Sequence, residues 1–259
     1  MKLGILGYPV AHSLSPRMQT AALRAVGLLD WTYEAIEVTP AQLAEALAVL
    51  RGPPWRGANI TLPHKEAAAR ACDRLSDEAS AIAAVNTIVV EDGRLHGHNT
   101  DIEAIRACVA EAARDRICAV LGAGGAARAA VAALRAAGAA EIRVLSRRAA
   151  ALPGATRACG WSAAALADCA VVVGCTPPDA APPPLGALAP DARVLDLVYY
   201  GPSALATLAR AHGFSVEDGR GVLLHQGARA FELWTGRPAP TTVMWEALGG
   251  GPDGGAYKS

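Results

Sequence analysis

The stretch from residue 116 to residue 148 constrains the fold of this chain more than any other. An apolar run is followed by a glycine-rich turn, an alanine-rich segment of helical length and a second apolar run. Gly122, Gly124 and Ala127 have the G-x-G-x-x-A spacing of the strand-to-helix turn in dinucleotide-binding units. The glycines permit a tight turn and close approach to a pyrophosphate, and the helix N-terminus offers N–H groups to the phosphates. The pattern therefore predicts a βαβ unit that binds a dinucleotide, with a merely structural turn as the alternative.

The end of the second apolar run indicates which dinucleotide binds. Sites that prefer NAD usually carry an acidic residue about 20 residues past the glycines, where it holds the ribose 2′-hydroxyl. This chain has Ser146, Arg147 and Arg148 at that place, and the nearest acid, Glu141, lies at the other end of the run. Guanidinium groups donate paired hydrogen bonds to a phosphate. We therefore expect NADP as the cofactor; a solvated basic turn is the alternative.

Composition limits the class of protein and its partners. The 259 residues suffice for one large domain or two ordinary ones, and 52% are hydrophobic, which supports a substantial core. Lys+Arg and Asp+Glu both number 24, so neither nucleic acid nor an anionic membrane surface is favoured as a partner. The six cysteines form no C-x-x-C pair, which indicates reduced packing residues. The opening apolar run is too short for a signal peptide or a membrane span, so we expect a cytoplasmic protein.

The order of the remaining patterns predicts an α/β fold with two domains. Strand-like and helical segments alternate up to about residue 101, with one helix capped at Ser15, another over 40–50, and a hairpin that turns at Asp92-Gly93. Further apolar runs and a helix over 203–212 extend a parallel sheet to about residue 220, and helical spacing then resumes over 224–234. We expect an N-terminal α/β substrate domain and a Rossmann-like, doubly wound NADP-binding domain, with the C-terminal helices returning to the first. The predicted boundaries are 1–101 with 225–259, and 102–224, with a cleft between the two domains.

The first domain carries a polar cluster at the ends of its predicted strands. Its members are Ser13, Ser15, the segment 59–65, Asn86-Thr87 and the segment 99–101. Lys65 lies at a strand-to-helix junction, and an ammonium beside the Asp101 carboxylate could relay a proton to a carbonyl that receives a hydride.

Each of these residues also has a simpler interpretation. Ser13 and Ser15 are common turn and helix-cap residues, and Lys65 alone is typical of a solvated surface. His12 or His64 could serve as the base instead, and His96 with His98 lacks a third ligand for a metal. The residues alone therefore predict an NADP-dependent oxidoreductase with a polar pocket, without naming its substrate.

A resemblance to a known family adds the substrate. The motifs are SLSP (13–16), NITLPHK (59–65), AVNT (84–87), GHNTD (97–101), GAGGAAR (122–128), SRR (146–148), DLVY (196–199) and LHQGARAFELWTG (224–236). In this order, over essentially the whole chain, they resemble the shikimate dehydrogenase family. The resemblance implies reversible, NADPH-dependent reduction of 3-dehydroshikimate to shikimate in aromatic amino acid biosynthesis.

The resemblance also assigns roles to residues. It implies Lys65 and Asp101 as the catalytic pair, with Lys65 donating a proton to the C3 oxygen. Substrate would be bound by Ser13, Ser15, Asn59, Thr61, Asn86, Tyr199 and Gln226. The cofactor would be bound by Asp77, Gly122, Ala123, Gly124, Gly125, Ala126, Ser146, Arg147, Arg148, Thr176, Leu197 and Gly219. No metal is implied, the partner is a small molecule, and the chain would be a monomer or a homodimer.

Two alternatives stay open. A quinate or quinate/shikimate dehydrogenase with NAD preference is the nearer one, although the arginine pair argues against it. A non-catalytic NADP-binding regulatory module is the other, and the presence of Lys65, Asp101 and Gln226 argues against that. Val222 stands where the family commonly has a Met beside the nicotinamide, which puts the exact placement of that ring in doubt.

Overall fold

The computed structural model describes residues 1–146 and 151–251 and divides the chain into two compact units. Unit 1 comprises Met1–Thr100 and Leu223–Ser259, and unit 2 comprises Asp101–Val222. Each unit has its own sheet and its own core. Whether the functional domains end where the sequence analysis places them, at residues 101 and 224, stays a prediction.

Unit 1 is built on a mixed sheet with the strand order β2-β1-β3-β5-β6-β4. The strands are β1 (Lys2–Gly7), β2 (Thr32–Glu37), β3 (Trp55–Ile60), β4 (Arg74–Leu75), β5 (Thr87–Glu91) and β6 (Arg94–His98). β5 runs antiparallel to β3 and to β6, and the other pairs are parallel. Asp92 (φ 49°) and Gly93 (φ 72°) join β5 to β6. Positive φ at both central residues is the geometry of a two-residue hairpin turn, so the predicted hairpin is confirmed.

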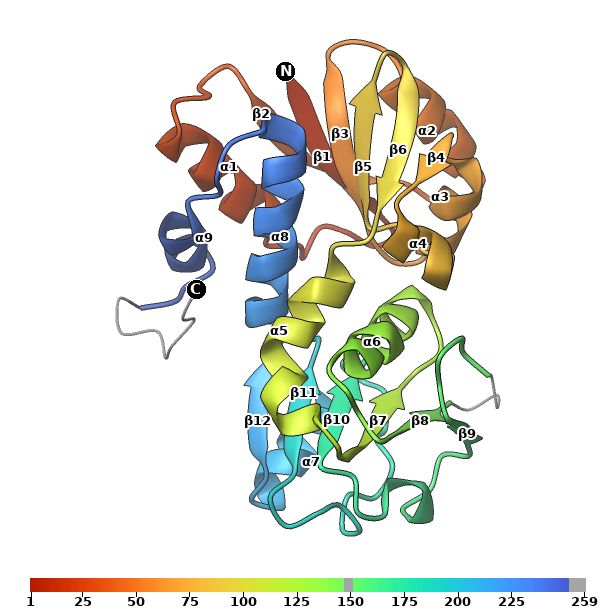
Figure 1. The fold of residues 1–259 in the computed structure, drawn as a ribbon. Helices are drawn as coiled ribbons and strands as arrows, with labels where there is room; N and C mark the ends of the chain where they lie inside the picture. The colour runs from red at the N-terminus through yellow and green to blue at the C-terminus, as the bar shows by residue number, and fades with distance from the viewer. Residues whose placement is uncertain (147–150, 252–259) are drawn as a thin grey trace. The chain divides into compact units, whose positions relative to one another are not determined.

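Helices cover both faces of this sheet (Figure 1). One face is packed by α2 (Leu43–Leu50), α3 (Lys65–Ala71) and α4 (Asp77–Ile82), whose apolar residues share a core cluster with Ile60, Ile88 and Leu95. The other face is packed by α1 (Ser15–Ala25) and α8 (Arg220–Thr235), and α9 (Thr241–Ala247) packs against α1. Trp234 Nε1 of α8 donates to the Ile88 carbonyl at 2.9 Å. The predicted return of the C-terminal helices to the first domain is therefore confirmed.

Some local expectations differ from the structure. Ser15 does not cap α1, because it is the first helical residue; Leu14 stands at the cap and makes no side-chain cap bond. The cause is the backbone of Leu14, which is already helical (φ −83°, ψ −7°), whereas a capping side chain normally sits on extended backbone. The segment predicted as one helix over 40–50 is a short 3₁₀ turn, η1 (Pro40–Gln42), followed by α2.

Unit 2 is a parallel sheet with helices on its two faces. Its strands are β7 (Ile117–Leu121), β8 (Glu141–Leu145), β9 (Arg157–Cys159), β10 (Val171–Gly174), β11 (Arg193–Asp196) and β12 (Ser215–Asp218). They follow the order β12-β11-β10-β7-β8-β9, and every described pair is parallel. α5 (Asp101–Ala113) and α6 (Gly125–Ala136) pack together on one face, while α7 (Ala204–Ala211) and η2 (Ala164–Leu166) join the core cluster of the other. This order reverses between β7 and β10, which is the doubly wound arrangement that the sequence predicts.

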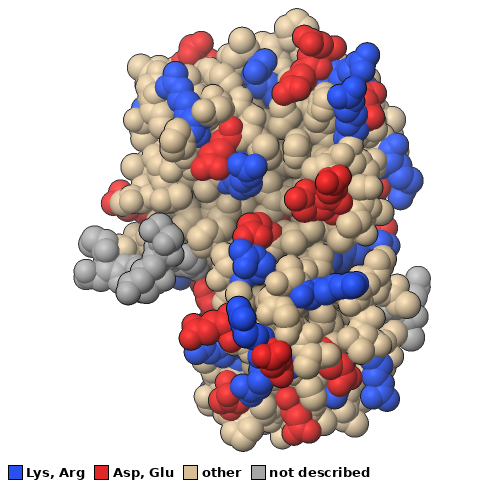
Figure 2. Space-filling model, viewed as in Figure 1, with Lys and Arg blue, Asp and Glu red and all other residues tan. Residues whose placement is uncertain are grey.

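The surface matches the balanced composition. On the face drawn in Figure 2, basic and acidic side chains of the described residues are interspersed over both units. In the described part of the chain, none of the helices has both the length and the apolar character that crossing a membrane requires.

Candidate functional site

The polar residues predicted in unit 1 gather at one edge of its sheet. β1, β3 and β6 run in the same direction and end at this edge, and β5 begins there because it is antiparallel. Thr61 follows β3, Asn86 precedes β5, and Asn99 with Thr100 follows β6. The strand directions therefore bring these segments together, although they are far apart in sequence.

Asn59 supports this edge from inside. It is 3% exposed, and its Oδ1 accepts the Tyr33 hydroxyl at 2.6 Å. Its Nδ2 donates to the Asn86 carbonyl at 3.2 Å and to Thr87 Oγ1 at 3.1 Å. Both ends of the carboxamide are therefore engaged by the protein, and Asn59 holds the residues around it in place. Tyr33 completes this network; the sequence analysis did not single it out, because one tyrosine in an alternating strand carries no special signal.

Asn86 fixes the backbone that leads to Asp101. Its Oδ1 accepts from Thr100 N at 2.8 Å, and its Nδ2 donates to Thr100 Oγ1 at 2.9 Å. Asn86 and Thr100 are both buried. Thr100, the last residue of this part of unit 1, is therefore held by the residue that precedes β5, and Asp101 is the next residue in the chain.

Lys65 begins α3 at the end of a segment that is bonded on both sides. Thr61 N donates to the Leu6 carbonyl at 2.9 Å, and Tyr8 N donates to the Leu62 carbonyl at 2.9 Å. The Lys65 carbonyl accepts from Val85 N at 2.9 Å, directly before Asn86. Two hydrogen bonds therefore connect the backbone of Lys65 to that of Thr100, one from Val85 N and one to the Asn86 side chain.

His64 does not suit the role of general base. The residue is 1% exposed, and its Nε2 lies 2.6 Å from the Val38 carbonyl oxygen. A carbonyl oxygen only accepts hydrogen bonds, so Nε2 is the donor in this contact and is occupied by the protein rather than by a substrate. His64 instead ties the start of α3 to the end of β2.

Four further predicted residues also lie in unit 1. Ser13 Oγ accepts from Ser15 N at 3.2 Å, and Ser15 is buried. Gln226 is 8% exposed, and its Nε2 donates to the Leu223 carbonyl one turn earlier in α8 at 2.9 Å. Asp77 is the first residue of α4 and is exposed. Ser13, Ser15 and Gln226 thus have local partners besides any ligand.

The glycine turn of unit 2 has the geometry that a dinucleotide needs. Gly122 follows β7 with φ +121°, and a Cβ there would lie 3.0 Å from the Cys175 carbonyl oxygen. A Cβ on Gly124 would meet nothing within 4 Å, so the space at the N-terminus of α6 is open. Ala127 is fully buried, as close packing of helix on sheet requires. Gly122, Ala123, Gly124, Gly125 and Ala126 therefore fit a pyrophosphate, with the first-turn N–H groups of α6 available as donors.

The other predicted cofactor residues follow the strands of the same sheet. Ser146 comes directly after β8, Thr176 follows β10, Leu197 follows β11, and Gly219 follows β12; Tyr199, which is predicted to bind the substrate, also follows β11. These are the carboxyl ends of parallel strands, where open α/β sheets bind ligands. Arg147 and Arg148 lie outside the described residues, so their binding of the 2′-phosphate of NADP stays a prediction.

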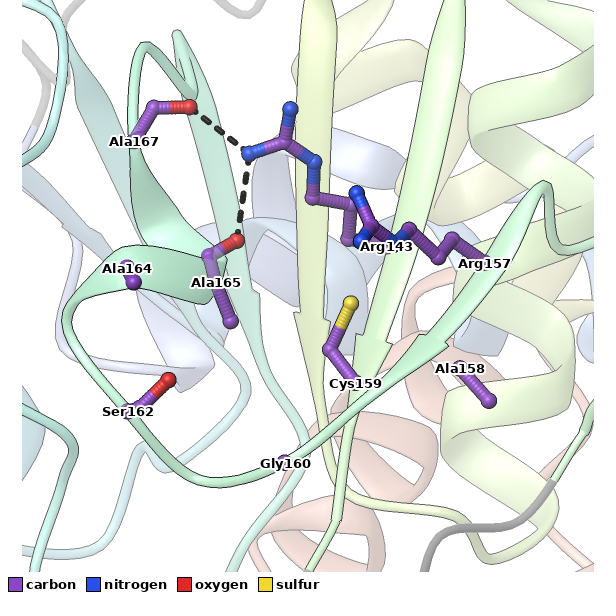
Figure 3. A pocket seen from close by; sticks show the side chains of 9 residues that line it. All are labelled: Arg143, Arg157, Ala158, Cys159, Gly160, Ser162, Ala164, Ala165 and Ala167. Carbon is purple, nitrogen blue, oxygen red and sulfur yellow. Dashed lines mark hydrogen bonds between the residues drawn. The ribbon is translucent and has the colours of Figure 1, made fainter.

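A separate cavity of about 400 Å³ lies beside β9 (Figure 3). Arg143 Nη1 donates to the carbonyls of Ala165 at 3.2 Å and Ala167 at 2.7 Å, and its Nε is paired with Glu141 at 2.8 Å. The guanidinium charge is thus balanced by Glu141, and the arginine anchors the segment around η2. None of the residues that line this cavity belongs to the predicted site.

The two sheets and the glycine turn define an α/β protein with a dinucleotide-binding unit, and comparison with known proteins gives its family. Residues 5–88 match the model of the shikimate dehydrogenase substrate binding domain, and residues 219–248 match that of the shikimate 5′-dehydrogenase C-terminal domain. The NADP(+) shikimate dehydrogenase of Anaeromyxobacter sp. (strain K) is 42% identical over 95% of this chain and 94% of its own length.

Solved structures of similar proteins also match this chain over nearly its whole length. The shikimate 5-dehydrogenase of Thermus thermophilus, in complex with NADP(H) and shikimate, is 35% identical with a TM-score of 0.85, over 96% of this chain and 98% of that one. The ligand-free 5-ketofructose reductase of Gluconobacter sp. strain CHM43 is 31% identical with a TM-score of 0.79, again over 96% and 98%. The chain belongs to the shikimate dehydrogenase family.

Proposed function

We propose that this protein is an NADP-dependent shikimate dehydrogenase, which reversibly reduces 3-dehydroshikimate to shikimate in aromatic amino acid biosynthesis. The observation that carries the proposal is the linkage of its two predicted catalytic segments. Val85 N is bonded to the Lys65 carbonyl, and the neighbouring Asn86 side chain is bonded to Thr100, next to Asp101. The match of nearly the whole chain to NADP(+) shikimate dehydrogenases supports the substrate and the cofactor.

Lys65 and Asp101 are the proposed catalytic pair. The reduced nicotinamide supplies the hydride when it is bound. The Lys65 ammonium then donates a proton to the C3 oxygen of the substrate, and in the reverse direction the amine takes that proton back. The Asp101 carboxylate stabilises the ammonium and keeps it close to the reacting oxygen.

The remaining site residues bind and orient the two ligands. Hydroxyls of Ser13, Ser15 and Tyr199 donate to the substrate carboxylate, which strengthens these bonds by its charge. Thr61, Asn86 and Gln226 bond to the ring hydroxyls or the reacting oxygen, and Asn59 supports them. The cofactor is held by the glycine turn, Gly122 to Ala126, by Ser146, Arg147 and Arg148 at the 2′-phosphate, and by Thr176, Leu197 and Gly219, with Asp77 at its margin.

The cellular setting follows from the same proposal. A formal charge of zero disfavours nucleic acid as a partner, and the reaction requires only the small-molecule substrate and the cofactor. We infer a cytoplasmic enzyme that is a monomer or a homodimer. Light scattering coupled to size-exclusion chromatography distinguishes those two states.

Initial rates of the purified protein test the proposal. Shikimate, quinate and the reduced form of 5-ketofructose are each offered with NADP and with NAD, and absorbance of the reduced nicotinamide is followed. We expect the highest kcat/KM with shikimate and NADP, at least tenfold above the other pairs, which corresponds to about 1.4 kcal/mol of selectivity. Equal kcat/KM values with NAD and NADP would contradict binding of the 2′-phosphate by Arg147 and Arg148. A preference for quinate or the fructose derivative would replace the proposed substrate, and no turnover at all would favour a regulatory module.

A further inference from the structure

A buried carboxylate lies at the end of β11, one residue before Leu197. Asp196 is 2% exposed, and its Oδ1 accepts from Val198 N at 3.2 Å. Its Oδ2 accepts the hydroxyl of Ser203, which is also buried. Ser203 in turn caps α7, where its Oγ accepts from Ala206 N at 2.9 Å. Asp196 and Ser203 therefore close the segment 197–202 into a loop with both ends fixed.

The loop between them is also bonded to the neighbouring strands. Leu197 N donates to the Gly174 carbonyl at the end of β10, at 3.0 Å. Gly219 N, just after β12, donates to the Val198 carbonyl at 3.2 Å. The segment 197–202 thus joins the carboxyl ends of three parallel strands, at the edge of the sheet where the cofactor residues lie.

Close contacts leave this loop little freedom. A Cβ on Gly219 would lie 2.3 Å from the Leu197 carbonyl oxygen, and a Cβ on Gly174 would lie 3.2 Å from Asp196 Oδ1. Real Cβ atoms do not occupy the first of these positions, so only glycine fits opposite Leu197. Gly174 and Gly219 therefore allow β10 and β12 to approach the loop closely.

Burial of the Asp196 carboxylate costs free energy, and a serine can cap a helix without such a carboxylate. Burial raises the pKa of Asp196, and its hydrogen bonds to Ser203 and Val198 only partly oppose that rise. Ser203 already provides the side-chain cap of α7, since its Oγ accepts from Ala206 N. Burying an acid that only neutral donors hold lowers the stability of the fold. We therefore expect the benefit of Asp196 to lie in the position of the loop 197–202.

We propose that Asp196 and Ser203 are positioning residues that hold Leu197 against the nicotinamide and Tyr199 towards the substrate carboxylate. The inference rests on the proposed function, since it takes the roles of Leu197 and Tyr199 from there. Asp196 acts through the backbone at Val198 and through Ser203. The pair thereby couples the start of α7 to the geometry of the ligand-binding edge.

Variants at Ser203 test the proposal against a matched control in the same helix. Ser203→Ala removes the hydroxyl that Asp196 accepts, and Ser203→Thr keeps it. Thr207→Val also removes a hydroxyl from the first part of α7, but Thr207 Oγ1 donates to the Ser203 carbonyl at 2.7 Å, whereas the side-chain hydrogen bonds of Asp196 are to Val198 and Ser203. Asp196→Asn keeps the size of the side chain and loses one of its two accepted bonds.

Two readouts are needed. Hydrogen exchange of the peptide covering 197–202 in the free protein reports the loop directly, and calorimetric titration with NADP, together with kcat and KM, reports its effect. We expect about tenfold faster loop exchange, about tenfold weaker NADP binding and a similar fall in kcat/KM for Ser203→Ala and Asp196→Asn, from the loss of one hydrogen bond. Ser203→Thr should restore the wild-type values, and Thr207→Val should keep them.

The outcomes separate this inference from the proposed function. If loop exchange and NADP affinity in Ser203→Ala stay within a factor of about two of the wild type, Ser203 is only a helix cap and the positioning role is wrong. The same holds if Thr207→Val reproduces the effects of Ser203→Ala. A wild-type protein that does not oxidise shikimate refutes the proposed function, whereas the exchange measurement still tests whether the pair orders the loop. Should Ser203→Ala not fold, Asp196→Asn against Thr207→Val decides the question with the same readouts.

Discussion

At the scale of the residue, the site combines one proposed charged pair with neutral side chains whose positions are fixed by buried hydrogen bonds. Asn59 and Asn86 use their carboxamides to hold Tyr33, Thr87 and Thr100. Buried polar groups are costly when unpaired, so the loss of one partner affects the others. Rigid neutral groups of this kind suit a ligand rich in hydroxyls, because each donor or acceptor is already oriented.

Replacing Lys65 tests the proton donor. Lys65→Ala should lower kcat by roughly 10²–10⁴, the range typical of lost general acid–base catalysis, while shikimate still binds in a calorimetric titration. Lys2→Ala is the matched control, since Lys2 is a half-exposed lysine of the same unit that contacts Glu34 and the Trp55 ring. If Lys65→Ala keeps turnover within a factor of about two, another group supplies the proton.

The cysteines give a prediction that depends on pH. Burial raises the pKa of Cys118 to about 12, and burial with the nearby Glu217 carboxylate raises the pKa of Cys108 to about 12. The thiolate is the reactive form, and its fraction falls tenfold for each pH unit below the pKa. At about pH 8 the folded protein should therefore resist iodoacetamide at both residues, with labelling increasing as the pH rises. Mass spectrometry with and without denaturant checks this, and rapid labelling of folded protein at Cys118 would contradict it.

The outcome at Ser15 shows a limit of sequence reasoning at this scale. A serine before a proline is typical of a helix cap, yet Ser15 is inside α1 because Leu14 already has helical angles. The choice between the two is made by the turn before the helix, where Ser13 N donates to the Val10 carbonyl. No pattern in the sequence around residues 10–13 predicts that turn.

At the scale of the element, segments that cover at least two periods of an apolar pattern were predictable, and segments that cover fewer were not. The strands β1, β3 and β7 and the helices α1, α6 and α8 have clear apolar patterns. β4 has two residues and α4 has six, too few for a period to be recognised, and the sequence analysis predicted neither. Both are defined by contacts instead: β4 pairs with β6, and Ser76 caps α4 by accepting from Ala79 N.

The anchoring of α8 on the first sheet can be tested at one side chain. Trp234→Phe removes the Nε1 donor to the buried Ile88 carbonyl and should lower the free energy of unfolding by about 1–3 kcal/mol. Trp161→Phe is the control, because its Nε1 bond to the Ala181 carbonyl is exposed and water replaces it. Thermal unfolding compares the two. An equal fall in stability for both variants would show that the bond to Ile88 has no special weight.

At the scale of the whole molecule, the sequence predicted a chain that leaves its first unit and returns to it. The helical spacing after residue 220 differs from the strand pattern before it; α8 packs on the first sheet and α9 packs on α1. The NADP-binding class was also predictable, because the glycine turn is local in sequence. No periodicity predicts the partnership of Lys65 with Asp101, since none links residues in different elements; the polar cluster suggested the pair, and the resemblance to the family implied its catalytic role.

Domain motion is the prediction that belongs to this scale. Two units joined near residues 101 and 224 are expected to close when both ligands bind, with these segments as hinges. Small-angle scattering with and without NADP and shikimate measures the change. A radius of gyration that is the same in both states would contradict closure.

A crystal structure of the protein with NADP and shikimate bound tests the central claim most directly. The account predicts Lys65 Nζ within about 2.6–3.2 Å of the C3 hydroxyl oxygen, with the Asp101 carboxylate beside it and the nicotinamide facing C3. A complex in which the amine of residue 65 and the carboxylate of residue 101 lie apart, or point away from the bound ring, would contradict it.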